Sequence, residues 1–315
     1  MKQRLEWIDN ARGLCMLAIL MFHTEMYYTG SDVLPYALYV PDVLATFFVV
    51  SGYLFSGSKP FSLRRKMVSI VRSIIVPYFI FTLIIALPKE MVHPTGENPL
   101  WLIVTGRASW FVAAIAVAEI IFALLAKWRV TWISLPIAVA AFPLAKTETP
   151  DYWCWKAALV SLLFVYAGYL FRRYERWFEN KKVVILVALA VVIITKFLTL
   201  WLSAKVVYCP VIIDQPCLFV INMLASALLI ITVCKQLPPL KGIGWMGQNS
   251  LYYYFFCGAV PTVVSLGFNA VGFTWQHQYW RVILALMLVY AVSTVIVLIC
   301  TKIRNALKSL PNSKH

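Results

Sequence analysis

The sequence predicts an all-α protein whose helices cross a membrane, and three observations support this. Of its 315 residues, 62% are hydrophobic and only 13% are charged, whereas a soluble domain carries about 25% charged residues. Apolar runs that approach the roughly 20 residues of a membrane span recur to the end of the chain. The segments between these runs are short, so we expect one integral-membrane domain over residues 1–315 and no separate soluble domain.

Ten apolar runs are the predicted transmembrane helices. They cover residues 8–28, 40–56, 73–88, 110–126, 131–145, 156–171, 183–203, 217–234, 249–267 and 280–300. We interpret the first run as a retained helix rather than a signal peptide, because Asp9 and Arg12 interrupt it and no small-residue cleavage site follows. An even number of spans puts both termini on the same side of the membrane.

Basic residues gather on one side of this predicted bundle. With the N-terminus inside, the inside segments hold 20 Lys and Arg residues and the outside segments hold 6, while Arg12 and Lys196 lie within spans. Positive charge accumulates on the cytoplasmic side of membrane proteins, so both termini are predicted to be cytoplasmic. The same asymmetry accounts for the net charge of +15. We therefore expect membrane lipid as a partner and no nucleic acid.

The first helix carries ionisable residues within its apolar run. On an α-helix, the eleven steps from Arg12 to His23 bring the imidazole back to within about 20° of the guanidinium, roughly 16 Å further along the axis. Ionisable residues at membrane depth usually face the bundle interior or a watered cavity. A permanent cation aligned with a base that titrates near neutrality suits a site that handles an anion and a proton. The alternative is a helix whose charged ends lie at the two membrane interfaces.

The second run contains the segment FFVVSGYLF, with Ser51, Gly52 and Tyr53 towards its predicted cytoplasmic end. Ser51 could bond a ligand or a neighbouring helix, and small residues are also common where membrane helices pack closely. In the fourth run Glu119 lies too deep to remain ionised without a partner. We expect it to pair with Arg12 or Lys196, or to serve in the site.

Cations also cluster before the third run, in what we interpret as a basic loop. Arg64, Arg65 and Lys66 are followed by Arg72 and then by Pro77. These residues are topology determinants in the simplest interpretation. A cluster of cytoplasmic guanidinium groups would also bind the phosphates of a donor such as coenzyme A.

The remaining candidates are single residues with ordinary structural roles as alternatives. Trp110 opens the fourth run as an interfacial aromatic anchor, and Asn249 is placed to cap the ninth helix. The seven cysteines are scattered without metal-ligand spacing, so no metal site is expected. Cys209 and Cys217 share one predicted external loop, where a disulfide between them is one option.

Taken in order, these motifs resemble the membrane-bound acyltransferase 3 family. The matching pieces are WIDNARG with ten residues between Arg12 and His23, FFVVSGYLF, the basic approach to VPY, SWF, and GQNSLYYYF, spread over nearly the whole chain. The likeness is closest to small members of the fucose-acetylase-like or enterobacterial-antigen-acetylase-like kind. Two departures are present, since Cys257 stands where many relatives have a His, and the arginines before Pro77 are not in the usual paired spacing.

The resemblance implies a bacterial inner-membrane enzyme that moves an acyl group, usually acetyl, from acyl-CoA to a hydroxyl of a cell-surface glycan or its lipid-linked precursor. Acetyl-CoA would be a co-substrate, with no permanently bound cofactor and a carbohydrate acceptor as partner. His23 would be the catalytic base and Arg12 its partner. The residues expected at the donor site are Arg72, Arg65, Ser51 and Tyr53, and those expected to support the site are Asp9, Glu119, Trp110 and Asn249.

Two further questions stay open at this level. Transfer could be direct or pass through an acetyl-His23 intermediate. A transporter or flippase for an anionic or glycan substrate would also contain buried charges in a helix bundle, although no clear inverted repeat is present. A non-catalytic membrane sensor is a third option, and the intact Arg12 and His23 argue against it.

Overall fold

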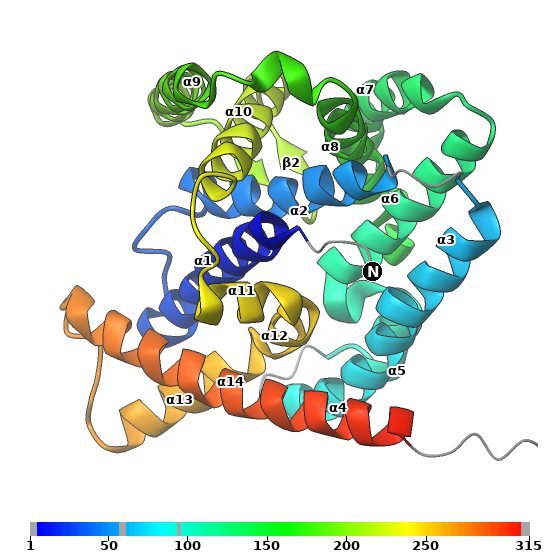
Figure 1. The fold of residues 1–315 in the computed structure, drawn as a ribbon. Helices are drawn as coiled ribbons and strands as arrows, with labels where there is room; N and C mark the ends of the chain where they lie inside the picture. Colours follow the sequence, from blue (N-terminus) through cyan, green and yellow to red (C-terminus); the bar gives the residue numbers. More distant parts are fainter. Residues whose placement is uncertain (1–4, 57–60, 93–95, 310–315) are drawn as a thin grey trace, which may run out of the picture. The chain divides into compact units, whose positions relative to one another are not determined.

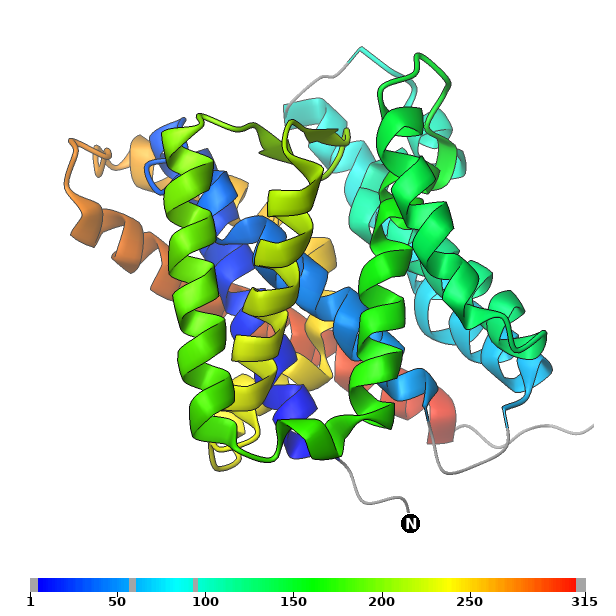
Figure 2. The same ribbon diagram turned by 90° about the horizontal axis from the view of Figure 1, so that it is seen from above.

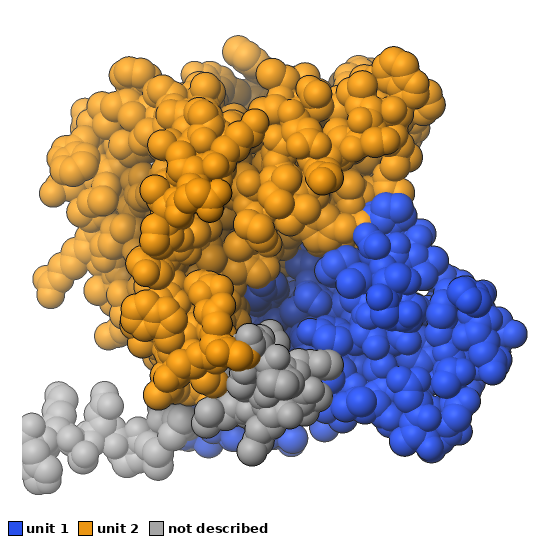
Figure 3. Space-filling view, turned by 180° about the vertical axis from the view of Figure 1, so that it is seen from behind, with its two compact units in different colours: residues 1–35, 239–315 blue, residues 36–238 orange. Residues whose placement is uncertain are grey.

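The computed structural model describes residues 5–56, 61–92 and 96–309, and its helices are drawn in Figure 1. Almost all regular structure in these residues is helical, which confirms the predicted all-α class. The chain forms two compact units, and Figure 3 colours them separately. Unit 1 combines residues 1–35 with 239–315, and unit 2 is the continuous segment 36–238.

Unit 1 is built around its N-terminal helix, which packs against every other helix of the unit. The elements of unit 1 are α1 (Glu6–Thr29), α11 (Lys241–Gln248), α12 (Ser250–Phe256), α13 (Ala259–Ala270) and α14 (Tyr279–Ser309). The longest contact joins α1 to α11, two elements far apart in the sequence.

Glycines let α1 and α11 approach closely. A Cβ atom built on Gly13 would stand 2.0 Å from the carbonyl oxygen of Ile243, and one on Gly247 would stand 1.8 Å from that of Asp9. Neither position has room for a side chain, so both glycines are required for this approach. Close backbone contact through small residues is how helices associate in membranes, where the hydrophobic effect between helices is weak.

The C-terminal end of α1 is tied down by polar contacts within unit 1. Glu25 is fully buried, and it accepts hydrogen bonds from the Leu34 N–H at 2.7 Å and the Tyr279 hydroxyl at 2.6 Å. The Tyr28 hydroxyl donates to the carbonyl oxygen of Phe273 at 2.8 Å. This end of the helix is therefore fixed to the loop that follows it and to the segment around α14.

Unit 2 contains the remaining helices and one short hairpin. Its main elements are α2 (Val40–Phe55), α3 (Leu63–Ile70), a π-helical stretch (Val71–Ile75), α4 (Val76–Val92), α5 (Pro99–Val104), α6 (Trp110–Lys127), α7 (Ser134–Ala145), α8 (Trp155–Arg173), α9 (Lys181–Trp201), β1 (Val206–Val207), β2 (Ile212–Ile213) and α10 (Pro216–Cys234). Short 3₁₀ turns lie at Tyr36–Leu38, Arg107–Ser109, Thr131–Ile133, Tyr152–Cys154 and Glu175–Phe178. The strands pair antiparallel, Val206 opposite Ile213 and Val207 opposite Ile212.

Helix α2 is the centre of unit 2 and packs against α8 and α10. A Cβ atom on Gly52 would stand 1.8 Å from the carbonyl oxygen of Val165, and one on Gly168 would stand 1.9 Å from that of Val49. The packing role weighed for Gly52 is therefore present. Helices α9 and α10 lie side by side with the hairpin joining them at one end, as Figure 2 shows.

The basic segment before the third predicted span is helical, so its interpretation as a loop was wrong. Helix α3 begins after Ser62, whose hydroxyl accepts a weak hydrogen bond from the Arg65 N–H at 3.5 Å. The helix continues through the π-helical stretch Val71–Ile75 into α4. Pro77 lies just after that stretch, in the first turn of α4. The apolar helix accordingly begins at Leu63, ten residues before the predicted start of the span at residue 73.

Within the described residues, six helices are long and apolar enough to cross a membrane. A seventh span would be the pair α12 and α13, which is bent by 47° at Cys257 and Gly258 within the predicted span 249–267. Helix α1, with its charged ends, and the shorter apolar helices Val40–Phe55 and Thr131–Ala145 correspond to the other three predicted spans. The total of ten spans and the orientation of the termini stay predictions.

Candidate functional site

His23 lies on the C-terminal half of α1 with aromatic neighbours from its own helix. Its imidazole is half-buried. The ring of Tyr27 stacks on it with centroids 6.3 Å apart, and the ring of Phe22 meets it edge-on at 5.3 Å. These ring contacts restrict the orientation of the imidazole. The side chain keeps part of its surface accessible.

The stacking partner of His23 also contacts the break between α12 and α13. The Tyr27 hydroxyl lies 3.6 Å from where a Cβ on Gly258 would stand, and it interacts with Cys257 and Thr262. Cys257, the departure from the family pattern noted in the sequence, is buried. Unit 1 therefore brings His23, Tyr27 and Cys257 into one neighbourhood, and sequence reasoning missed Tyr27 because nothing in its spacing singles it out.

The other expected site residues of unit 1 lie towards the N-terminal half of α1. Helix α1 is uninterrupted from Glu6 to Thr29, so Arg12 shares a face with His23 at the expected separation of roughly 16 Å. Asp9 is buried against α11, with Gly247 packed on its carbonyl group. Asn249 occupies the N-cap position of α12, but its side chain donates to the Trp245 carbonyl at 2.9 Å instead of capping the helix.

In unit 2, Ser51 of α2 contacts Glu119 of α6, which agrees with the prediction that Ser51 could bond a neighbouring helix. The carboxylate of Glu119 accepts a hydrogen bond from the Ser51 hydroxyl and forms an ion pair with Lys66 at 2.9 Å. Lys66 also lies over the ring of Phe55, 4.0 Å from its centroid. Of the alternatives given for Glu119, pairing with Lys196 is wrong, because Lys196 forms an ion pair with Asp42 at 2.6 Å.

The two arginines expected at the donor site are both exposed in unit 2. Arg65 is on α3 next to Lys66, and Arg72 is in the π-helical stretch that follows. Seven residues separate them, about two helical turns, so they lie on similar faces about 10 Å apart along the axis. Lys66, which pairs with Glu119, follows Arg65 directly in the sequence and lies about 100° from it around the helix.

Tyr53, also expected at the donor site, contacts a different group of charged residues. Its side chain is buried and its hydroxyl donates to Glu175 at 2.9 Å, while Glu175 forms an ion pair with Lys235. The guanidinium of Arg172 lies 4.7 Å from the Tyr53 ring centroid. Burial lowers the pKa of Lys235 below its usual range, and Glu175 acts in the opposite direction. Tyr53 therefore belongs to a second charged cluster, which the sequence did not indicate.

Trp110 is partly buried and contacts the core of unit 2, and its role as an interfacial anchor stays a prediction. Its ring stacks on that of Tyr208, with centroids 5.9 Å apart. Tyr208 is fully buried, stacks also on Phe48, and shares a hydrogen bond of 3.0 Å with Ser161. Trp110 therefore contacts Tyr208, the side chain that the hairpin contributes to the core of unit 2.

A family model described as an acyltransferase domain, that of acyltransferase family 3, matches residues 5–302. The chain belongs to the acyltransferase 3 family. No curated protein and no solved structure matches it. The match spans both units, and the sequence resemblance is confirmed.

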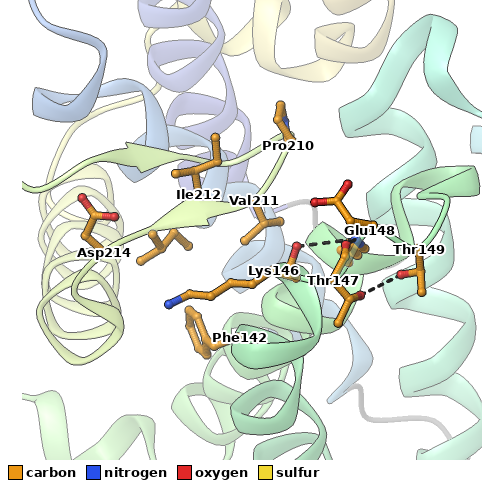
Figure 4. A pocket seen from close by; sticks show the side chains of 12 residues that line it. Phe142, Lys146, Thr147, Glu148, Thr149, Pro210, Val211, Ile212 and Asp214 are labelled. Carbon is orange, nitrogen blue, oxygen red and sulfur yellow. Dashed lines mark hydrogen bonds between the residues drawn. The ribbon is translucent and has the colours of Figure 1, made fainter.

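This acyltransferase also has a pocket that sequence reasoning missed, with a volume of about 400 Å³. It lies in unit 2 between the segment after α7 and the hairpin strand β2 (Figure 4). The ring of Phe142, the ammonium of Lys146 and the carboxylates of Glu148 and Asp214 line it. Aromatic faces combined with charged and hydroxyl groups are a lining that suits polar ligands.

One cation of the pocket wall serves the helix instead of a ligand. Lys156 is buried, and its ammonium donates to the carbonyl oxygens of Thr147 at 2.5 Å and Ala145 at 3.5 Å. These carbonyls terminate α7, where a cation complements the helix dipole. Among the described residues, no three His, Cys, Asp or Glu side chains are grouped so as to hold a metal ion.

Proposed function

We propose that this acyltransferase moves an acetyl group from acetyl-CoA to a hydroxyl of a cell-surface glycan or its lipid-linked precursor. It would do so in the bacterial inner membrane with both termini in the cytoplasm. The observation that carries the proposal is the family match over residues 5–302, together with Arg12 and His23 on one uninterrupted helix.

In the proposed reaction His23 is the general base. The imidazole takes the proton of the acceptor hydroxyl as that oxygen attacks the thioester carbonyl. The carbon–sulfur bond then breaks, and the thiolate of coenzyme A recovers a proton from the imidazolium. Stacking on Tyr27 supports this role because it fixes the orientation of the ring. The covalent alternative forms acetyl-His23 first and then transfers the acetyl group to the hydroxyl.

Cations serve the donor in this proposal. Arg12 lies about 16 Å from His23 along α1, too far for both side chains to act on one carbonyl group. We therefore assign Arg12 to the donor's phosphates rather than to the thioester. Within unit 2, Arg65 and Arg72 are assigned to phosphate binding on their own account, since guanidinium groups form paired hydrogen bonds with phosphate.

Transfer of labelled acetyl from acetyl-CoA in membranes that carry the protein tests the function. We expect label in the glycan fraction with the wild type, and a loss of about 100-fold or more with His23→Asn. The matched control is His277→Asn, because His277 is exposed in a loop with positive φ that Asn tolerates. Full activity of His23→Asn, or equal loss in both variants, would remove His23 from the mechanism.

The alternative function is a transporter, and one observation favours it. The bent pair α12 and α13 is the kind of interrupted helix that transporters place at substrate sites. Transporters built on repeats use such helices in corresponding pairs, however, and one bent pair is present among the described residues. Movement of a glycan across vesicle membranes without covalent labelling would favour this alternative over acyl transfer.

A further inference from the structure

The connection between α8 and α9 joins two helices that can cross a membrane. These helices belong to the spans Tyr152–Arg173 and Lys181–Trp201. Two consecutive spans are joined at a membrane surface, so the segment between them, residues 174–180, is expected there. Figure 2 shows the connection at the end of α9 opposite the β1–β2 hairpin. A segment at this depth meets lipid headgroups as well as water.

One side of this connection is fixed to the core of unit 2. Its 3₁₀ turn repeats every three residues, so Glu175 and Phe178 point to the same side. Glu175 accepts a hydrogen bond from the Tyr53 hydroxyl at 2.9 Å and forms an ion pair with Lys235. The ring of Phe178 contacts that of Phe171, with centroids 5.1 Å apart. These contacts hold the turn in place and leave its other two sides available.

The second side presents two aromatic rings to the exterior. Tyr174 and Trp177 are three positions apart, and their ring centroids lie 5.0 Å from each other. The Trp177 N–H donates to the Tyr174 carbonyl at 3.0 Å, which closes the turn beneath the rings. Trp177 is 80% exposed, the highest value for a large apolar side chain in the described residues, and Tyr174 is 40% exposed. Trp and Tyr are the side chains that membrane proteins place at the level of the lipid headgroups.

The third side is basic. Arg173 and Arg176 are also three positions apart and exposed, and exposed Lys181 and Lys182 follow in the first turn of α9. Within the part of the chain that the structure describes, these four side chains form no ion pair, and Glu179 is the one carboxylate of the connection left to oppose them. Cations in the first turn of a helix also oppose its dipole. The side therefore has an excess of positive charge that an anion from outside the chain would neutralise.

We propose that residues 173–182 bind the headgroup of an anionic phospholipid. The guanidinium and ammonium groups would bind its phosphate, and each basic residue near an anionic membrane surface strengthens binding about 5-fold. The exposed ring of Trp177 favours a lipid over a soluble phosphate, because only a lipid surface also covers the ring. The proposal depends on α8 and α9 crossing the membrane. It does not depend on acyl transfer or on the orientation of the termini.

Binding of phosphatidylglycerol to the purified full-length protein in detergent tests the site, with phosphatidylcholine of the same acyl chains as the zwitterionic reference. Native mass spectrometry measures the fraction of protein that carries a lipid at each lipid concentration. We expect the wild type to prefer phosphatidylglycerol, and Arg173→Gln with Arg176→Gln to lower that affinity about 25-fold. The affinity for phosphatidylcholine should stay unchanged. Lys181→Gln with Lys182→Gln is a second exposed pair and should give a similar loss.

The matched control is Lys302→Gln with Arg304→Gln, which removes the same charge from exposed positions of α14. An equal loss in this control would show a general charge effect and overturn the proposal, as would equal affinity of the wild type for the two lipids. Displacement of phosphatidylglycerol by inorganic phosphate or coenzyme A would assign the cations to a soluble phosphate and also overturn it. Acetyl transfer has no part in this measurement, so failure of the lipid site and failure of the proposed function are distinguishable.

Discussion

Two carboxylates of unit 2, Asp42 and Glu119, are equally buried, yet they have different surroundings. The Asp42 side chain is 9% exposed and that of Glu119 is 11% exposed. Each forms an ion pair with a lysine, but Lys196 is 13% exposed and Lys66 is 23% exposed. Burial of the carboxylate does not separate the two regions, whereas the environment of the lysine does.

The region around Asp42 is a closed network. Asp42 accepts hydrogen bonds from Asn222 and pairs with Lys196, both at 2.6 Å. Lys196 donates also to the Ala37 carbonyl at 2.9 Å, and Thr195 donates to Asn222 at 2.8 Å. Helices α2, α9 and α10 supply the side chains, and the 3₁₀ turn Tyr36–Leu38 supplies the Ala37 carbonyl. We therefore expect this network to stabilise the packing of these helices.

The region around Glu119 is open on one side. Ser51 and Lys66 bind the carboxylate, and the neighbouring Arg65 is exposed. A lysine with an accessible surface can contact the phosphate of a ligand while it stays paired with its carboxylate, whereas an enclosed lysine would have to leave a buried charge unpaired. The comparison teaches that a charge inside an apolar run predicts a partner, and the exposure of that partner indicates whether the pair can take part in binding.

The largest effect should come from breaking the closed network. Asp42→Ala leaves Lys196 without a counter-charge, and removal of one member of a buried pair costs about 3–5 kcal/mol. We expect a corresponding fall in the midpoint of thermal unfolding in detergent. The double variant Asp42→Leu with Lys196→Leu should recover most of the loss, because it removes both charges. A loss of less than about 1 kcal/mol of unfolding free energy in the single variant would contradict a stabilising role for this network.

A smaller effect is expected from the open pair. Glu119→Gln keeps the size of the side chain and can still accept from Ser51, and Lys66 can turn to solvent. We expect a loss of about 1–3 kcal/mol, the cost of a missing charge-assisted hydrogen bond. The same thermal unfolding assay measures it. If Glu119→Gln destabilises as much as Asp42→Ala, the distinction between closed and open regions fails.

Helix α2 carries both Asp42 and Ser51, so adding a methyl group within this helix tests whether the stabilities of the two regions are independent. Gly52→Ala places a methyl group 1.8 Å from the Val165 carbonyl, and such overpacking costs about 1–3 kcal/mol. We expect this loss to be non-additive with Glu119→Gln, whose partner Ser51 is adjacent, and additive with Asp42→Ala.

The matched control for Gly52→Ala is Gly267→Ala. Gly267 lies in α13 with nothing within 4 Å of the added Cβ, so the substitution should be neutral or slightly stabilising. Equal losses at Gly52 and Gly267 would show that helix glycines matter for a reason other than close contact.

The smallest effect on stability is expected at the exposed cations. Arg65→Met should change the unfolding free energy by less than about 0.5 kcal/mol, while the KM for acetyl-CoA rises about 10-fold, equivalent to about 1.4 kcal/mol of lost phosphate binding. Kinetics at varied donor concentration measure this separation. Arg64→Met is the matched control, since Arg64 is its exposed neighbour on another face. A similar rise in KM for both variants would indicate a general charge effect.

Much of the helical organisation could be predicted from hydropathy, and the partners of the buried charges could not. The predicted span at 183–203 corresponds to Lys181–Trp201 and that at 217–234 to Pro216–Cys234, because a long apolar run is a local property. The pairing of Asp42 with Lys196 is long-range, and Asp42 itself is hidden in the average of an apolar segment. Two opposite charges inside apolar runs were the available signal.

The start of the third span was missed for a different reason. Hydropathy locates where a helix becomes apolar and not where it begins, and Arg64, Arg65 and Lys66 lowered the average over its first turns. Ser62, a residue type favoured at helix N-caps, marked the true beginning. Capping residues therefore locate helix ends in charged segments better than hydropathy does.

The π-helical stretch Val71–Ile75 changes which residues of α3 and α4 share a face of the continuous helix. A π turn holds about one residue more than an α turn, so the stretch turns the helix about as far as four α-helical residues would. Twelve regular α-helical steps from Lys66 to Tyr78 would leave their side chains about 120° apart, whereas absorbing one residue brings them to within about 20°. Tyr78, which is buried and bonded to the Ile103 carbonyl at 2.9 Å, and Lys66, which pairs with Glu119, therefore lie near one face of the continuous helix. The extra residue lets one span direct a core contact and an ion pair to the same side.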